Sequence, residues 1–242
     1  MSIWEYANPK KFMALSGRVL PWVTGLAVLS LGAGMVWGFF LTPDDYKQGS
    51  TVKIIYIHVP AASAAINAWA VMLIASLVWI IRRHHVSALV AKAAAPVGLT
   101  FTLIALVTGA FWGQPMWGTW WAWDPRLTNF LIFALFYLGY IALWEAVENP
   151  DTAADLTGVL CIVGSVFALL SRYAVLFWNQ GLHQGASLSM DAQENVSDVY
   201  WIPLVICIAG FELLFLALVL VRARTEIRRR RAQALMARER LA

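Results

Sequence analysis

The sequence predicts an all-α, polytopic integral membrane protein with six transmembrane helices and a Trp-rich segment at the membrane surface. Of its 242 residues, 60% are hydrophobic and only 13% are charged, against about 25% charged in a typical soluble domain. Six long runs contain no charged residue, and a helix that spans a bilayer needs about 20 mostly apolar residues. The third observation is the stretch 112–126, in which several Trp residues are interleaved with Gly and Pro.

The uncharged runs place the six spans near residues 19–41, 59–81, 94–112, 127–147, 156–178 and 199–221. The first run is long and lacks a small-x-small cleavage site, so we interpret it as a retained span rather than a signal peptide. Within it, Gly34 and Gly38 would let another helix approach closely. Cys161 and Cys207 lie inside apolar spans and form no Cys-x-x-Cys pair, so we expect packing roles for both.

The distribution of Lys and Arg predicts the orientation. An even number of spans puts both termini on one side, and that side carries 14 Lys and Arg residues against four on the other. Because basic residues favour the cytoplasm, both termini are expected there and the Trp-rich segment on the periplasmic side. The net charge of +4 then reflects topology, and no nucleic-acid partner is expected. The tail 222–242 is expected to form a basic helix on anionic lipid.

The stretch 112–126 holds five of the 13 Trp residues and ends in Asp124 and Arg126. The uncharged run 93–123 that contains most of it would be about 46 Å long as a helix, against a hydrocarbon core of about 30 Å. The stretch also contains four residues that disfavour a regular helix: Gly113, Pro115, Gly118 and Pro125. We therefore expect it to leave the third span at Gly113 and Pro115 and lie along the membrane. One or two anchoring Trp residues at a helix end are ordinary, but five exceed that role.

Two His residues are expected on the same side. His58 precedes Val59-Pro60, at the mouth of the second span, and His183 lies between Gly181 and Gly185. A lone His is usually structural, but two imidazoles from different spans can ligate a haem iron from opposite faces. The indoles would then stack on the macrocycle, and Arg126 and Arg172 are the nearest bases for its propionates.

Other polar groups are expected to have structural roles. His84 and His85 are neighbours, so on a helix they point about 100° apart and chelate a metal poorly; we interpret them as part of the basic cytoplasmic signal. The loop 145–155 has four acids and no base, which would suit a basic partner. Glu212, in the sixth span, is expected to face a neighbouring helix or another subunit.

The run from Trp117 to Asp124 matches the Trp-Gly-x-x-Trp-x-Trp-Asp signature of the haem-handling protein family. His58 stands in Tyr-Ile-His-Val-Pro-Ala-Ala and His183 in Leu-His-Gln-Gly. With six spans, the chain resembles the haem exporter C family of bacterial c-type cytochrome maturation over nearly its whole length.

The resemblance implies one six-span domain, residues 1–242, in the bacterial inner membrane. It implies that haem b is held transiently at the periplasmic surface, with His58 and His183 as axial ligands. The haem would then pass to a periplasmic haem chaperone, with an ABC-type ATPase, its membrane subunit and a small membrane subunit as partners. The platform implied by the family consists of Trp117, Gly118, Trp120, Trp121, Trp123 and Asp124. The chain has no Gly-Lys pair and hence no Walker A loop, so we expect no enzyme activity, and ATP hydrolysis by a partner.

Three alternatives compete with this interpretation. A transmembrane b-type cytochrome needs His ligands facing each other within the spans, whereas both candidates lie at span ends. A haem channel needs polar groups along the bundle, where only Arg172 and Glu212 are found. A single-complex cytochrome c synthetase shares the Trp-rich signature but needs further spans and a further domain, for which 242 residues leave no room.

Overall fold

The computed structural model describes residues 3–177 and 196–239, and within these ranges every element is a helix. Six of the helices are long and apolar enough to cross a membrane, as predicted. The elements are η1 (Ile3–Ala7), α1 (Pro9–Val36), η2 (Trp37–Leu41), η3 (Ser50–Ile54), α2 (Ile55–Arg82), α3 (His85–Trp117), α4 (Pro125–Ala146), α5 (Pro150–Phe177) and α7 (Asp198–Glu239). The protein is therefore a multi-pass, all-α membrane protein.

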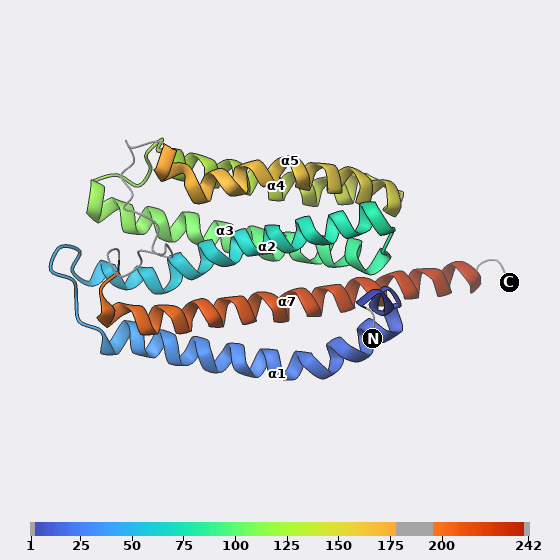
Figure 1. Ribbon diagram of the computed structural model, residues 1–242, viewed down its shortest axis with the longest axis horizontal. Helices are drawn as coiled ribbons and strands as arrows, with labels where there is room; N and C mark the ends of the chain where they lie inside the picture. The colour runs from blue at the N-terminus through green and yellow to red at the C-terminus, as the bar shows by residue number, and fades with distance from the viewer. Residues whose placement is uncertain (1–2, 178–195, 240–242) are drawn as a thin grey trace.

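The long helices run antiparallel to their chain neighbours and form three layers (Figure 1). α2 and α3 make the central pair, α4 and α5 pack on one side of it, and α7 with α1 packs on the other. The short connection 118–124 lies at one end of the bundle, which we call the Trp end. The opposite end, with the start of α1, the end of α7 and the connections 83–84 and 147–149, is called the terminal end.

The helices are longer than the predicted spans, and the expected break in the third span is wrong. α3 passes through Gly113 and Pro115 and ends at Trp117. A proline lacks only its own N–H donor, and membrane helices tolerate that loss when packing supports the turn. Gly118 caps this helix end: it has φ 74° and donates its N–H to the Gln114 carbonyl at 2.9 Å. Glycine adopts this left-handed conformation without steric cost.

The tail is the second such extension. α7 continues without a break from the apolar span to Glu239, and Figure 1 shows its carboxyl end projecting beyond the other helices. Arg224 ties this extension to α1, because its guanidinium donates to the Met13 carbonyl at 2.7 Å and to Ser16 Oγ at 2.8 Å. The predicted helix of the basic tail is confirmed as far as Glu239, as a continuation of the sixth span, and its contact with lipid stays a prediction.

Small residues let the helices approach, as predicted for Gly34 and Gly38. A Cβ at Gly34 would lie 2.6 Å from Cys207 Sγ on α7, and one at Gly38 would lie 2.5 Å from the Tyr56 ring on α2. Cys207 and Cys161 are both buried and both free thiols, so their predicted packing roles are confirmed. Without a hydrophobic force between helices in lipid, such close contact is what holds a membrane bundle together.

Glu212 lies near the middle of the apolar part of α7 and contacts the neighbouring helix α2. Its Oε1 accepts hydrogen bonds from Asn67 Nδ2 at 2.7 Å and from Ser63 Oγ at 3.3 Å. A carboxyl group at this depth is costly unless hydrogen-bonded. Of the two interpretations left open by the sequence, the structure supports contact with a neighbouring helix.

Candidate functional site

The connection between α3 and α4 is built by helix capping at both ends. After Gly118 the chain crosses to Asp124, which is 7% exposed and accepts a hydrogen bond from the Leu127 N–H at 2.9 Å. Pro125 follows as the first residue of α4, a position where its missing N–H costs nothing. Asp124-Pro125 is thus a helix start, and the carboxylate of the Trp-rich signature has a structural role that the sequence interpretation missed.

The indoles of this connection form an aromatic surface at the Trp end. Trp120 is 57% exposed and Trp123 78% exposed, while Trp117 and Trp121 are half-buried. Trp121 and Trp123 meet edge to face, with ring centroids 5.6 Å apart. Trp120 stands edge-on to Phe111 of α3 at 5.5 Å. Exposed indoles that are braced by ring contacts offer stacking faces without rearrangement of the chain.

His58 lies at the same end, in the first turn of α2. α2 begins at Ile55, four residues earlier than the expected start near 59, so Pro60 falls just beyond the first turn. The imidazole is half-buried against α3, where its ring meets Trp112 edge to face at 5.7 Å. The Trp112 indole in turn donates to Gln48 Oε1 at 2.8 Å, which ties the loop before α2 to the same place.

Two side chains on α3 complete the surroundings of the His58 ring. Its Nδ1 lies 3.1 Å from Thr108 Oγ1, and a Cβ at Gly109 would lie 3.0 Å from its Cε1. The sequence interpretation missed Thr108 and Gly109, although they lie one turn before Trp112 on the same helix. Their contribution depends on the pairing of α2 with α3, which spacing alone does not specify.

The remaining predicted site residues divide into two groups. Arg126 is half-buried in the first turn of α4, close in sequence to the aromatic surface. His183 lies outside the described residues. Arg172 belongs to α5, but its side chain also lies outside the described part of the chain. The Trp end therefore brings together His58, Arg126 and the residues of the Trp-rich signature.

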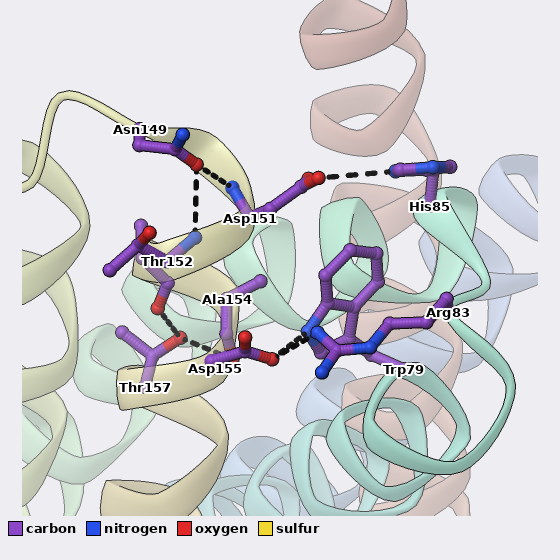
Figure 2. Close-up of polar contacts among 10 residues, drawn as sticks. Trp79, Arg83, His85, Asn149, Asp151, Thr152, Ala154, Asp155 and Thr157 are labelled. Carbon is purple, nitrogen blue, oxygen red and sulfur yellow. Dashed lines mark hydrogen bonds and ion pairs between the residues drawn. The ribbon is translucent and has the colours of Figure 1, made fainter.

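The terminal end holds the acidic loop, and its acids pair with bases of this chain (Figure 2). Asp155 accepts from the Trp79 indole at 2.9 Å and from the Arg83 guanidinium. Asp151 lies 3.8 Å from His85 Nδ1, and Glu145 and Glu226 lie 3.7 and 3.6 Å from Lys92. Three of the four acids thus have basic side chains of the same chain within 4 Å, and the expected basic partner stays a prediction.

His84 and His85 have local roles at this end. His84 caps α3, because its Nδ1 accepts the Ser87 N–H at 3.0 Å, and His85 packs on the Trp79 ring at 5.2 Å. Among residues 3–170 and 196–239, no three His, Cys, Asp or Glu side chains gather as a metal cluster. A porphyrin fills four positions on its iron, so haem needs only one or two protein ligands.

Comparison with known proteins identifies relatives over the whole chain. A family model described as Heme exporter protein C matches residues 2–238. The chain is 72% identical over 242 residues to Heme exporter protein C of Rhodobacter capsulatus, covering all of both chains. It is 74% identical over 239 residues to the protein of that name from Paracoccus denitrificans, covering 99% of each. Against the Escherichia coli K12 protein the identity is 39% over 226 residues, covering 93% of this chain and 91% of the other.

Proposed function

The chain belongs to the heme exporter protein C family, and we propose that it holds one haem at the Trp end and passes it to a haem chaperone. The role of the family is haem handling for cytochrome c maturation, as the membrane subunit of an ABC-type transport complex. The observation that carries the finer proposal is the coincidence of exposed indoles and a held imidazole at one end of the bundle.

In this proposal the haem is cargo, and this chain contributes position. Trp120 and Trp123 would stack on the macrocycle, with Trp117, Gly118 and Trp121 completing the platform. His58 and His183 would be the two axial ligands of the iron, and Arg126 and Arg172 would pair with the propionates. Asp124 would act through the start of α4, which its carboxylate caps.

Delivery would follow from ligand exchange. A platform on the surface leaves an edge of the porphyrin accessible, and a His of the periplasmic chaperone would displace one axial His. The bound species would be haem b, held transiently. The sequence has no Gly-Lys pair and hence no Walker A motif. ATP hydrolysis would come from an ABC ATPase, which would assemble with its membrane subunit and a small membrane subunit.

The orientation belongs to the same proposal. The Lys and Arg excess at the terminal end supports cytoplasmic termini and a periplasmic Trp end in the bacterial inner membrane. The basic carboxyl end of α7 projects beyond the bundle, where Arg side chains would meet anionic lipid headgroups. A transmembrane b-type cytochrome is less well supported, because the described His residues lie at the helix ends: His58 at one end, His84 and His85 at the other.

Visible absorption spectroscopy of purified protein with equimolar added haem tests the site. We expect a low-spin spectrum from the wild type and from His85→Ala, which changes a His at the opposite end. His58→Ala and His183→Ala should each lose the low-spin spectrum and retain haem at least about tenfold more weakly. Wild-type spectra from both of these variants would contradict the proposal.

A further inference from the structure

The Thr108 hydroxyl has its single proton committed to the backbone of α3. Its Oγ1 lies 2.7 Å from the Ile104 carbonyl oxygen and 3.3 Å from the Ala105 carbonyl oxygen. Carbonyl oxygens only accept, so the hydroxyl is the donor in these contacts. The same Oγ1 lies 3.1 Å from His58 Nδ1. With the proton directed at Ile104, the shorter contact, Oγ1 has only lone pairs to offer the imidazole.

It follows that His58 Nδ1 carries a hydrogen and donates it to Thr108. A neutral imidazole has one N–H and one lone pair, so an Nδ1–H ring has its lone pair on Nε2. We propose that Thr108 is a positioning residue for His58, selecting the Nδ1–H tautomer and making Nε2 the nitrogen that ligates iron. The ligation rests on the proposed haem function, whereas the tautomer does not.

The surroundings of His58 restrict the orientation of its ring as well as the position of its proton. Gly109 leaves 3.0 Å between His58 Cε1 and the place of a Cβ, so a side chain there would push the imidazole away. The Trp112 ring stands at 82° to the imidazole plane. Three positions on one face of α3 thus hold the ring, and Thr108 is the one that distinguishes its two nitrogens. A hydrogen bond to the second nitrogen raises the basicity of a ligating His.

His84 is expected to adopt the opposite tautomer to His58 and so serves as an internal comparison. Its Nδ1 lies 3.0 Å from the Ser87 backbone N–H, which can only donate. His84 Nδ1 must therefore hold the lone pair, and the neutral ring carries its hydrogen on Nε2. Two His residues of the same chain are thus expected in opposite tautomers, one set by a hydroxyl oxygen and the other by an amide hydrogen.

Nitrogen NMR of the haem-free full-length protein tests the tautomer directly. The chain has four His residues, so labelling His with ¹⁵N gives few signals, which single His→Gln variants assign. At a pH where the rings are neutral, we expect Nδ1–H at His58 and Nε2–H at His84. Thr108→Ser should keep the His58 pattern, and Thr108→Val should shift it towards Nε2–H while His84 stays unchanged. An Nε2–H ring at His58 in the wild type would overturn the proposal.

Haem titration with visible spectra then tests the ligation. Thr108→Val should weaken haem retention by about 10-fold to 100-fold, and Thr108→Ser should restore it. Thr102→Val is the matched control, because the Thr102 hydroxyl makes the same kind of bond to the Gly98 carbonyl at 2.8 Å on the same helix. Equal losses in Thr108→Val and Thr102→Val would assign the effect to helix stability and overturn the positioning role.

The two readouts separate the failure of this proposal from failure of the proposed function. If His58→Ala leaves the haem spectrum unchanged while the NMR shows Nδ1–H at His58, the haem function fails and the tautomer selection stands. If His58→Ala removes the low-spin spectrum while Thr108→Val binds haem as tightly as the wild type, the haem function stands and the positioning role of Thr108 is refuted.

Discussion

At the terminal end Trp79 is buried and donates to Asp155, whereas at the Trp end Trp123 is 78% exposed. Tryptophan is thus buried between helices at one end of the bundle and exposed on the surface at the other. His residues differ in the same way. His85 packs on Trp79 beside an acid, and His58 is held by a hydroxyl and a glycine on α3.

This difference teaches where to look for binding in a membrane bundle. At the terminal end the carboxylates meet bases of the same chain, so the polar groups are used for folding (Figure 2). At the Trp end aromatic area is left exposed, and the His58 imidazole lies against the Thr108 hydroxyl. Exposed aromatic rings beside an oriented imidazole indicate a binding site. A network of paired charges between helices indicates a structural contact.

The largest expected effect contrasts two Trp residues. Trp79→Ala removes a buried indole and one donor to Asp155, so the free energy of unfolding should fall by about 3–5 kcal/mol. Trp123→Ala should change it by less than about 0.5 kcal/mol while weakening haem retention. Denaturant unfolding and haem titration of both variants check this. Equal destabilisation would mean that the Trp end is as structural as the terminal end.

The next effect concerns the acid of the Trp-rich signature. Asp124→Ala removes the side-chain cap of α4 and should lower the free energy of unfolding by about 1 kcal/mol. Asp124→Asn keeps a capping oxygen and should stay within a few tenths of the wild type. Parallel denaturation and haem titration measure both. If Asp124→Asn unfolds like the wild type but loses haem, the charge itself contributes to binding.

A smaller effect on stability is expected from the ion pair between Arg83 and Asp155 at the terminal end. The Arg83 and Asp155 side chains are 58% and 44% exposed, so Arg83→Ala should lower the free energy of unfolding by only about 0.2–1 kcal/mol. Arg83 has φ 51°, which Gly adopts freely. Arg83→Gly should therefore be less destabilising than Arg83→Ala, as denaturant unfolding can show. The reverse order would mean that the left-handed turn costs nothing at this position.

The smallest effect is a pH dependence at His84. Burial lowers the pKa of His84 below its ordinary value, and the neighbouring His85 lowers it further. Folding thus favours the neutral ring. Its contribution to stability is complete above the unfolded pKa of about 6.5 and declines as the pH falls below it. His84→Asn keeps a capping group that does not titrate. The midpoint of unfolding should fall less between pH 7 and pH 5 in this variant than in the wild type.

Much of the architecture follows from local sequence properties. Uncharged runs predicted six spans, because lipid forces every apolar stretch of sufficient length to satisfy its backbone as a helix. Gly34, Gly38 and the two Cys residues were read correctly as packing positions, since small residues in spans have few other uses. The helix ends were less well predicted: Gly113 and Pro115 lie inside α3, because packing overrides the preference of single residues.

The sequence by itself determined the helical membrane fold, through the lengths of its apolar runs. It also indicated haem handling, through the Trp-rich signature and the resemblance to a family. Only the tertiary structure decided which side chains meet. The pairing of α2 with α3 placed Thr108 against His58, and the packing of α5 beside α2 placed Asp155 against Trp79. Helix periodicity specifies the face on which a residue lies, but the partner of that face depends on how the helices pack.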